Sequence, residues 1–327
     1  MAVVTADNLT AFTRDLERDE LIDQVFTGNQ LLFRMNSDNR VTEDGGTNVE
    51  FEVVVNTGVG GSYGDFDTLS TADQEFAIQA TIPWKHYYEP VVISGIQRLK
   101  NMGRTRIINL LDAKREHAAM SLSDNIGTGL WSDGTGNSNK DLQGLRAMLS
   151  TSSTYENINP TTYTTWAASI DSTTNTLTLA TIDDQITNQS IGAQTPTDII
   201  GNKAVYNKIH GLVIGAERHN KPAFGSPGGA AEAMARAGFQ VIEYQGIPVY
   251  YDEKSPGSGD TNTDNFLTFL NMKRLELVVH EMDNFELDDF RPAPDQRAMN
   301  SFWFWTGNFL TKERRVQGAM TTIDPAL

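Results

Sequence analysis

The stretch from Val41 to Trp84 contains eight carboxylates and no lysine or arginine. Apolar and polar residues alternate in it twice, at positions 49–55 and 76–82, on either side of a glycine-rich segment at 58–64. Alternation with a period of two predicts strands, and clustered glycine predicts the turn between them. The stretch is therefore expected to form a long acidic hairpin.

A hairpin of this kind needs a surface outside itself, because an isolated two-stranded hairpin is marginally stable in water and like charges repel. The following segment, residues 85–117, contains three acids and seven basic residues, namely Lys85, Arg98, Lys100, Arg104, Arg106, Lys114 and Arg115. We therefore predict that the hairpin of one copy contacts the basic segment of another. The predicted contact residues are Glu50, Phe51, Glu52, Val53, Phe76 and Ile78 on the hairpin, and Arg98, Lys100, Arg104 and Arg106 on the basic segment.

Composition excludes several classes of protein. No run approaches the ~18 apolar residues of a membrane helix, and the first residues show no basic region followed by an apolar one, so neither a membrane span nor a signal peptide is expected. The absence of cysteine excludes disulfides and thiolate metal sites. The net charge of −16 disfavours tight nucleic-acid binding. It fits a wall that encloses DNA without gripping it, and it fits equally well an acidity that only keeps the protein soluble.

The remaining pattern predicts an α+β fold whose helices and strands are segregated along the chain. Residues 5–26 are expected to form a helix that packs on another copy or on its own body. Residues 93–125 are expected to form one long helix, spanning roughly 45 Å at 1.5 Å per residue. Residues 150–180 read as a loop that leads into a mixed region at 181–265. Strands are expected at 266–270, 275–280, 299–306 and 310–322.

No catalytic, cofactor-binding or metal-binding residue is predicted, and the chain is not expected to be an enzyme. The five histidines are scattered, and neither a nucleophile elbow nor a phosphate-binding loop is present. A calcium-like alternation of oxygen ligands runs through Asp133, Thr135, Asn137, Asn139 and Asp141. Ser138 and Gly144 stand where such a loop needs glycine and a bidentate glutamate, so an Asx-rich turn capping a helix at Leu142 is the favoured interpretation.

Two further segments have alternative interpretations. The acids between 281 and 289 are expected to form a solvated loop, although they could also hold a cation or a basic surface. The run Phe302-Trp303-Phe304-Trp305 could stack on bases, but no basic residue is interleaved with it. A strand buried on both faces is therefore the favoured interpretation.

The segment after the long helix resembles a motif of the major capsid proteins of tailed bacteriophages, whose shell fold is shared with herpesvirus capsids and encapsulins. The matching residues are Leu130-Trp131-Ser132-Asp133-Gly134-Thr135-Gly136-Asn137, then Leu142-Gln143-Gly144-Leu145, then the aromatic segment from Tyr155 to Trp166. The order of elements carries the resemblance further. It implies an N-terminal arm at 1–40, an extended hairpin loop at 41–84, a peripheral domain with a spine helix at 85–160, an inserted axial domain at 161–265, and C-terminal strands at 266–327 that return to the peripheral domain.

The resemblance implies a structural protein that self-assembles into an icosahedral shell of pentamers and hexamers around double-stranded DNA. The implied location is the virion, with assembly in the host cytoplasm. The implied partners are other copies of the chain, with a separate scaffolding protein, a portal and decoration proteins as further candidates. The hairpin has no lysine, so a covalent crosslink through a loop lysine is not expected. An encapsulin-type compartment, a tail or decoration component, and an enzyme with a β-rich C-terminal domain are the alternatives.

Overall fold

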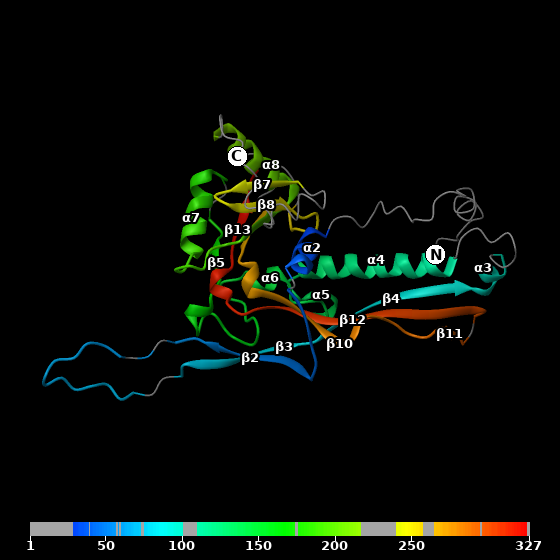
Figure 1. Cartoon of the computed structure of the whole chain (residues 1–327), viewed down its shortest axis with the longest axis horizontal. Coiled ribbons are helices and arrows are strands. Elements are labelled where there is room, and N and C mark those ends of the chain that lie inside the picture. Colours follow the sequence, from blue (N-terminus) through cyan, green and yellow to red (C-terminus); the bar gives the residue numbers. More distant parts are fainter. Residues whose placement is uncertain are drawn as a thin grey trace.

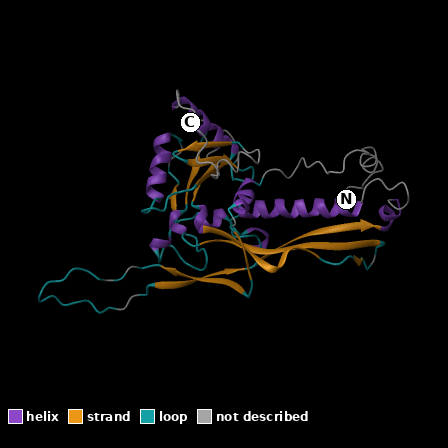
Figure 2. Cartoon of the chain, in the orientation of Figure 1, coloured by secondary structure: helices purple, strands orange, loops and turns teal. Residues whose placement is uncertain are grey.

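The computed structural model describes residues 29–38, 40–56, 58, 60–72, 75–100, 110–173, 176–216, 240–257, 265–294 and 296–325. The expected helix at 5–26 lies outside these residues, as do Arg104 and Arg106. The described chain contains two large sheets, a separate hairpin, and helices packed against the sheets (Figures 1 and 2).

The first sheet has six strands in the order β5-β13-β9-β6-β8-β7. Their bounds are β5 Ser169–Asp171, β6 Asp198–Gly201, β7 Val241–Tyr244, β8 Ile247–Tyr251, β9 Asn265–Leu270 and β13 Gly318–Ile323. The helices α7 (Leu179–Gln189) and α8 (Lys203–Ala216) pack on it, with a core that includes Ile182, Val205, Ile209 and Phe269. Thr178 begins α7 with a capping box, in which its side chain accepts from the amide of Thr181 at 3.2 Å.

The second sheet is long and narrow. Its strands are β1 (Val41–Asp44), β4 (Lys85–Ser94), β10 (Leu275–Leu287), β11 (Arg291–Pro292) and β12 (Ala298–Thr311), in the order β1-β10-β12-β11 with β4 also paired to β12. Pro90 is tolerated in β4 because β4 lies at the edge of the sheet and pairs only with β12. Short elements connect these parts: α3 Gly95–Lys100, α5 Gly136–Asn139, α6 Leu145–Met148, η1 Thr164–Trp166, η2 Met272–Arg274 and η3 Arg314–Val316.

A 21-residue helix, α4 (Leu110–Leu130), lies along this long sheet (Figure 1). Its residues Ala118, Leu122, Ile126 and Leu130 recur every fourth position and are buried, which gives the helix one apolar stripe. The core around Leu122, Ile126 and Leu130 also includes residues of α2 (Gln30–Ser37), of the long sheet and of the six-stranded sheet, so it joins the two sheets.

The predicted hairpin is present: β2 (Asn48–Val54) pairs antiparallel with β3 (Ala77–Pro83). Several boundaries differ from expectation. The helix expected from 93 to 125 begins later, because Ile93 and Ser94 end strand β4, and the described helix continues to Leu130. The strands expected at 299–306 and 310–322 are divided differently, because β12 runs unbroken to Thr311 and β13 begins at Gly318.

The last 60 residues do not all lie beside the long helix. Strands β10 and β12 belong to the long sheet, but β9 and β13 pair in the six-stranded sheet with β6 and β5. That residues 266–327 return to a peripheral domain stays a prediction; the structure shows that their strands are shared between the two sheets. The acids at 281–287 form part of β10 and not a loop, and in the aromatic run only Trp305 is fully buried while Phe304 is exposed.

Candidate functional site

The hairpin has an inner row of side chains that packs on its own subunit. Val49, Val53 and Val55 are buried, and Phe51 is half-buried. They pack in two small clusters, one with Ile158 and Trp166 and the other with Val278 and Leu310. The structure therefore places Val53 inside the subunit. The partly buried Phe51 packs against both clusters, and the partly buried Ile78 packs against the one with Ile158 and Trp166.

The outer row of β2 faces solvent. Glu50 and Glu52 are exposed, Val54 is 72% exposed, and Gln79 of β3 donates a hydrogen bond to Glu50 Oε2 at 2.6 Å. The alternation predicted from the sequence thus separates an apolar face that covers the body from an acidic face that is open. Both carboxylates of the predicted contact set lie on the open face.

The distal part of the hairpin carries large apolar side chains in solvent, namely Tyr63, Phe66, Leu69 and Phe76. Phe66 is fully exposed and Phe76 is 69% exposed. The hairpin projects beyond the rest of the molecule at one end of its longest axis (Figure 1). Apolar groups held out on a projecting arm are typical of a surface that another chain covers.

Some basic side chains of the segment 85–117 form contacts within the subunit, and others are exposed to solvent. Lys114 donates to Val92 O at 2.7 Å, Lys85 donates to Asn139 O at 2.5 Å, and Arg115 pairs with Asp112 and lies over the ring of Phe290. Arg98 and Lys100 on α3 are exposed. They lie beside Ile96 and Leu99, which are also exposed.

The hairpin and α3 lie at opposite ends of the molecule's longest axis (Figure 1). The acidic row and the basic end therefore cannot meet within one copy. Any contact between them joins two copies, in a head-to-tail arrangement.

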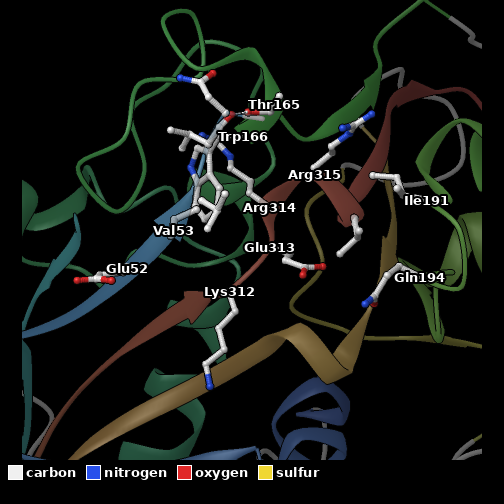
Figure 3. A pocket seen from close by; sticks show the side chains of 14 residues that line it. Glu52, Val53, Thr165, Trp166, Ile191, Gln194, Lys312, Glu313, Arg314 and Arg315 are labelled. Carbon is white, nitrogen blue, oxygen red and sulfur yellow. Dashed lines mark hydrogen bonds between the residues drawn. The ribbon is translucent and has the colours of Figure 1, made fainter. Parts of the chain in front are cut away.

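The root of the hairpin borders an open cleft of about 650 Å³ (Figure 3). One wall is the edge of β2, and the other is the segment that follows β12; the lining residues include Glu52, Val54, Trp166, Ile191, Arg315 and Val316. Arg314 also lines the cleft, and its guanidinium donates to three main-chain carbonyls: Met148 O at 2.7 Å, Ser150 O at 2.5 Å and Ser153 O at 3.1 Å.

A buried carboxyl, Glu156, lies beside Arg314 at this root. Thr311 donates its amide to Glu156 Oε1 at 2.7 Å, and the side chain is 2% exposed. Burial raises the pKa of Glu156 well above its ordinary value, although Thr311 and Arg314 act against that rise. Burial, which disfavours the charged form of each group, lowers the pKa of the Arg314 guanidinium to about 10. The sequence analysis missed both residues, and the one available signal was that Glu156 is an isolated charge in a stretch of serine, threonine and asparagine.

The motif at 130–145 serves packing. Asp133 Oδ1 accepts from the amide and hydroxyl of Thr135, as the predicted Asx turn requires, but the helix expected to start at Leu142 is α6, which begins at Leu145. Gly144 is in close contact with the end of α4, where an added Cβ would overlap the carbonyl oxygen of Leu130. Among the described residues, no group of three or more histidine, aspartate or glutamate side chains is placed to hold a metal ion.

Within the described chain, none of the helices is both long enough and apolar enough to span a bilayer. No protein-family model and no curated protein matches the sequence.

Solved structures match the chain over nearly its whole length. A chain of the cyanophage A-1(L) capsid gives a TM-score of 0.69 at 16% identity, covering 94% of this chain and 96% of that chain. The capsid of Myoviridae phage XM1 gives a TM-score of 0.57 at 14% identity, covering 98% and 99%. The SrpI encapsulin of Synechococcus elongatus gives 0.57 at 12% identity, covering 100% and 98%. The chain therefore has the α+β shell fold of phage capsids and encapsulins, and the resemblance predicted from the sequence is confirmed at the level of the fold.

Proposed function

We propose that this chain is a major capsid protein, a non-enzymatic subunit that assembles into a closed icosahedral shell of pentamers and hexamers around double-stranded DNA. The observation that carries the proposal is the match to the cyanophage A-1(L) capsid chain, which covers 94% of this chain and 96% of that chain. In this proposal, residues 1–40 act as an arm, α4 as the spine helix and the six-stranded sheet as the core of an axial domain. The shell belongs to a virion assembled in the host cytoplasm.

The projecting hairpin supplies the contact between subunits. Its outer carboxylates, Glu50 and Glu52, meet the exposed basic end of the next subunit at Arg98 and Lys100, with Arg104 and Arg106 in the same segment. Phe76 and the apolar residues near the tip become buried on that neighbour. Each exposed ion pair contributes about 0.2–1 kcal/mol, so a shell built this way is stabilised by many weak contacts and by apolar burial.

Charge reversal on the outer row tests this arrangement. Glu50→Lys combined with Glu52→Lys places like charges opposite Arg98 and Lys100, and both positions are exposed, so we expect folded subunits that do not assemble. Sedimentation velocity measures assembly, and circular dichroism measures folding. The matched control is Glu253→Lys combined with Asp184→Lys, a double reversal outside the hairpin. Shells from the hairpin variant at the yield of the control would contradict electrostatic docking.

A protein-filled compartment is the second candidate, because the SrpI encapsulin matches this chain over 100% of its length. The two candidates differ in content and not in subunit fold. Particles purified from the natural source, treated with nuclease and then opened, should release DNA if the chain is a phage capsid protein. Release of one abundant folded protein without DNA would favour the compartment. A scaffolding protein, a portal and decoration proteins remain the expected partners of the capsid.

A further inference from the structure

The tight turn at Tyr155–Ile158, beneath the hairpin root, holds a residue in an unfavourable conformation. Tyr155 and Ile158 exchange main-chain hydrogen bonds at 3.2 and 2.9 Å, and the two residues between them, Glu156 and Asn157, have φ values of 56° and 63°. Asparagine adopts this left-handed region readily, but glutamate does so rarely and at a cost in free energy. Contacts around Glu156 must therefore hold it there.

Those contacts join three parts of the fold. The main-chain carbonyl of Glu156 accepts from the amide of Thr81 on β3 at 3.1 Å, and its Oε1 accepts from the amide of Thr311 at the end of β12 at 2.7 Å. One residue thus links the returning strand of the hairpin to the long sheet. The other carboxyl oxygen, Oε2, is buried and has no hydrogen-bond donor within the described chain.

The ionisable groups facing Glu156 are few. Strands β3 and β12 contain no ionisable residue, and the acids of β2 lie on its exposed outer row. The groups that act on the Glu156 carboxyl are the phenol of Tyr155 and the guanidinium of Arg314. The neighbouring charges of the Arg314 segment are directed elsewhere: Lys312 pairs with Glu276, Glu313 pairs with Arg274, and Arg315 is exposed in the cleft.

Arg314 has two competing sets of acceptors. It now donates to the carbonyls of Met148, Ser150 and Ser153, and it lies over the ring of Tyr155. No ion pair joins Arg314 to Glu156, although both lie in the described chain. A neutral Glu156 leaves Arg314 on the carbonyls, whereas an ionised Glu156 without a donor at Oε2 attracts the guanidinium away from them.

We propose that Glu156 is a proton-operated latch at the hairpin root. While the carboxyl is neutral, Arg314 stays on the carbonyls of the 148–153 segment and fixes it beneath the turn that joins β3 to the end of β12. When the carboxyl loses its proton, Arg314 moves towards it, the 148–153 segment is released, and the root of the hairpin loosens. The link to assembly rests on the proposed function, because in a shell the hairpin of one subunit must be oriented to reach the neighbouring subunit.

The pH dependence has a definite sign. Burial raises the pKa of Glu156 above the ordinary value of 4.5, so the native chain holds this proton more tightly than the unfolded chain does. The stabilisation is complete below that ordinary value and is lost as pH rises through the native pKa. The root should therefore be tighter under mildly acidic than under alkaline conditions.

Hydrogen exchange of the purified full-length chain tests the latch, with rates corrected for the intrinsic effect of pH. In the wild type, we expect protection of peptides covering 77–83 and 148–158 to fall severalfold between about pH 5 and about pH 9, as the buried carboxyl loses its proton. In Glu156→Gln, which keeps the shape and cannot ionise, protection should stay within about twofold over the same range.

The matched control is Glu313→Gln, which removes an acid next to Arg314 that lies outside the latch. This control should lose protection with pH as the wild type does. An equal loss in Glu156→Gln, or no loss in the wild type, would overturn the proposal. If Glu156→Gln does not fold, the ¹³C-carboxyl titration of the wild type decides: a Glu156 pKa near 4.5 overturns the latch. Both readouts use unassembled subunits, so a failure of shell formation would not be mistaken for a failure of the latch.

Discussion

Arg34 and Asp198 form a buried ion pair that fixes α2 to the six-stranded sheet. Arg34 Nε donates to Asp198 Oδ1 at 2.8 Å and Nη2 donates to Oδ2 at 3.2 Å, with side-chain exposures of 5% and 0%. Asp38, four residues further along the chain, also pairs with Arg34. Burial by itself would lower the pKa of Arg34, but the carboxylates of Asp198 and Asp38 together outweigh burial and raise that pKa. The pair is a polar anchor of α2, beside the hydrogen bond from the Leu31 amide to Asp252 Oδ2.

Breaking this pair from one side should be costly. Asp198→Ala removes the fully buried carboxylate and leaves the guanidinium paired with the partly exposed Asp38, so we expect a loss at the lower end of about 3–5 kcal/mol in the free energy of unfolding. The double variant Arg34→Met with Asp198→Leu removes both charges and should recover most of that loss. Urea unfolding followed by circular dichroism compares the two. A double variant as unstable as Asp198→Ala would show that the pair itself, and not the unpaired charge, accounts for the effect.

At the same scale, the sequence identified the residue types of the hairpin but not all of their roles. Alternation in β2 correctly predicted that Glu50 and Glu52 share one face. It could not show that Val53 is buried on its own subunit, because that depends on Ile158 and Trp166, more than 100 residues away in the chain. Lys85 and Lys114 belong to the basic segment identified from the sequence, yet they donate hydrogen bonds to carbonyls of their own subunit.

At the scale of elements, substitutions at two glycines distinguish the effect of close packing on stability from the effect of helix propensity. Gly144 lies between α4 and α6, where a Cβ would overlap main-chain oxygens of Gly129 and Leu130, so Gly144→Ala should destabilise the chain by roughly 1–3 kcal/mol. Gly211 lies inside α8 with nothing within 4 Å of an added Cβ, so Gly211→Ala should stabilise it by about 0.5–1 kcal/mol. Thermal unfolding measures both, and shifts of the same sign would contradict the packing described at Gly144.

The two faces of β2 provide a second matched pair. Val53→Ala removes buried methyl groups from the root cluster and should cost roughly 2 kcal/mol, from ~0.8 kcal/mol per buried carbon group plus a cavity term. Val54→Ala alters a side chain that is 72% exposed and should change subunit stability by less than about 0.5 kcal/mol. Denaturant unfolding of unassembled subunits distinguishes them. Equal losses of stability would show that the inner row of β2 does not stabilise the packing at the base of the hairpin.

The predicted boundaries of helices and strands agree with the structure where the hydrophobic periodicity is clear. They differ from it where a segment fits both a helical and a strand pattern. Strand β9 was expected at 266–270 and is found at Asn265–Leu270. The apolar residues at 93–99 fit a helical stripe, but Ile93 and Ser94 pair with Met299 and Ala298 as strand. Pairing between distant strands overrides local propensity at such positions, and no local pattern reports it.

At the scale of the whole molecule, the apolar core that stabilises the subunit is separate from the hairpin that projects out of it. The two sheets share one apolar core, whereas the distal hairpin exposes its large side chains. The sequence predicted the α+β class and the hairpin formed by β2 and β3. It did not predict that the final strands are divided between two sheets, because strand partners follow from global topology and not from the pattern of each strand.

Apolar burial at the hairpin should contribute more to assembly than its charges do. Phe76→Ala removes an exposed ring that a neighbour would bury, worth about 1.5–3 kcal/mol per contact, whereas Glu52→Gln removes about 0.2–1 kcal/mol. We expect Phe76→Ala to raise the protein concentration needed for assembly more than Glu52→Gln does, with no change in subunit unfolding. Light scattering against concentration measures this threshold. The reverse ranking would show that ion pairs dominate the contact.

Negative-stain electron microscopy of the purified full-length chain, at several protein and salt concentrations, tests the central claim most directly. Subunits with this fold and a projecting hairpin should form closed shells of uniform diameter, and those shells should become scarcer as salt screens the acidic row. Open tubes, single rings, or monomers at every concentration and with a co-expressed scaffolding protein would contradict the assignment of this chain as a capsid subunit.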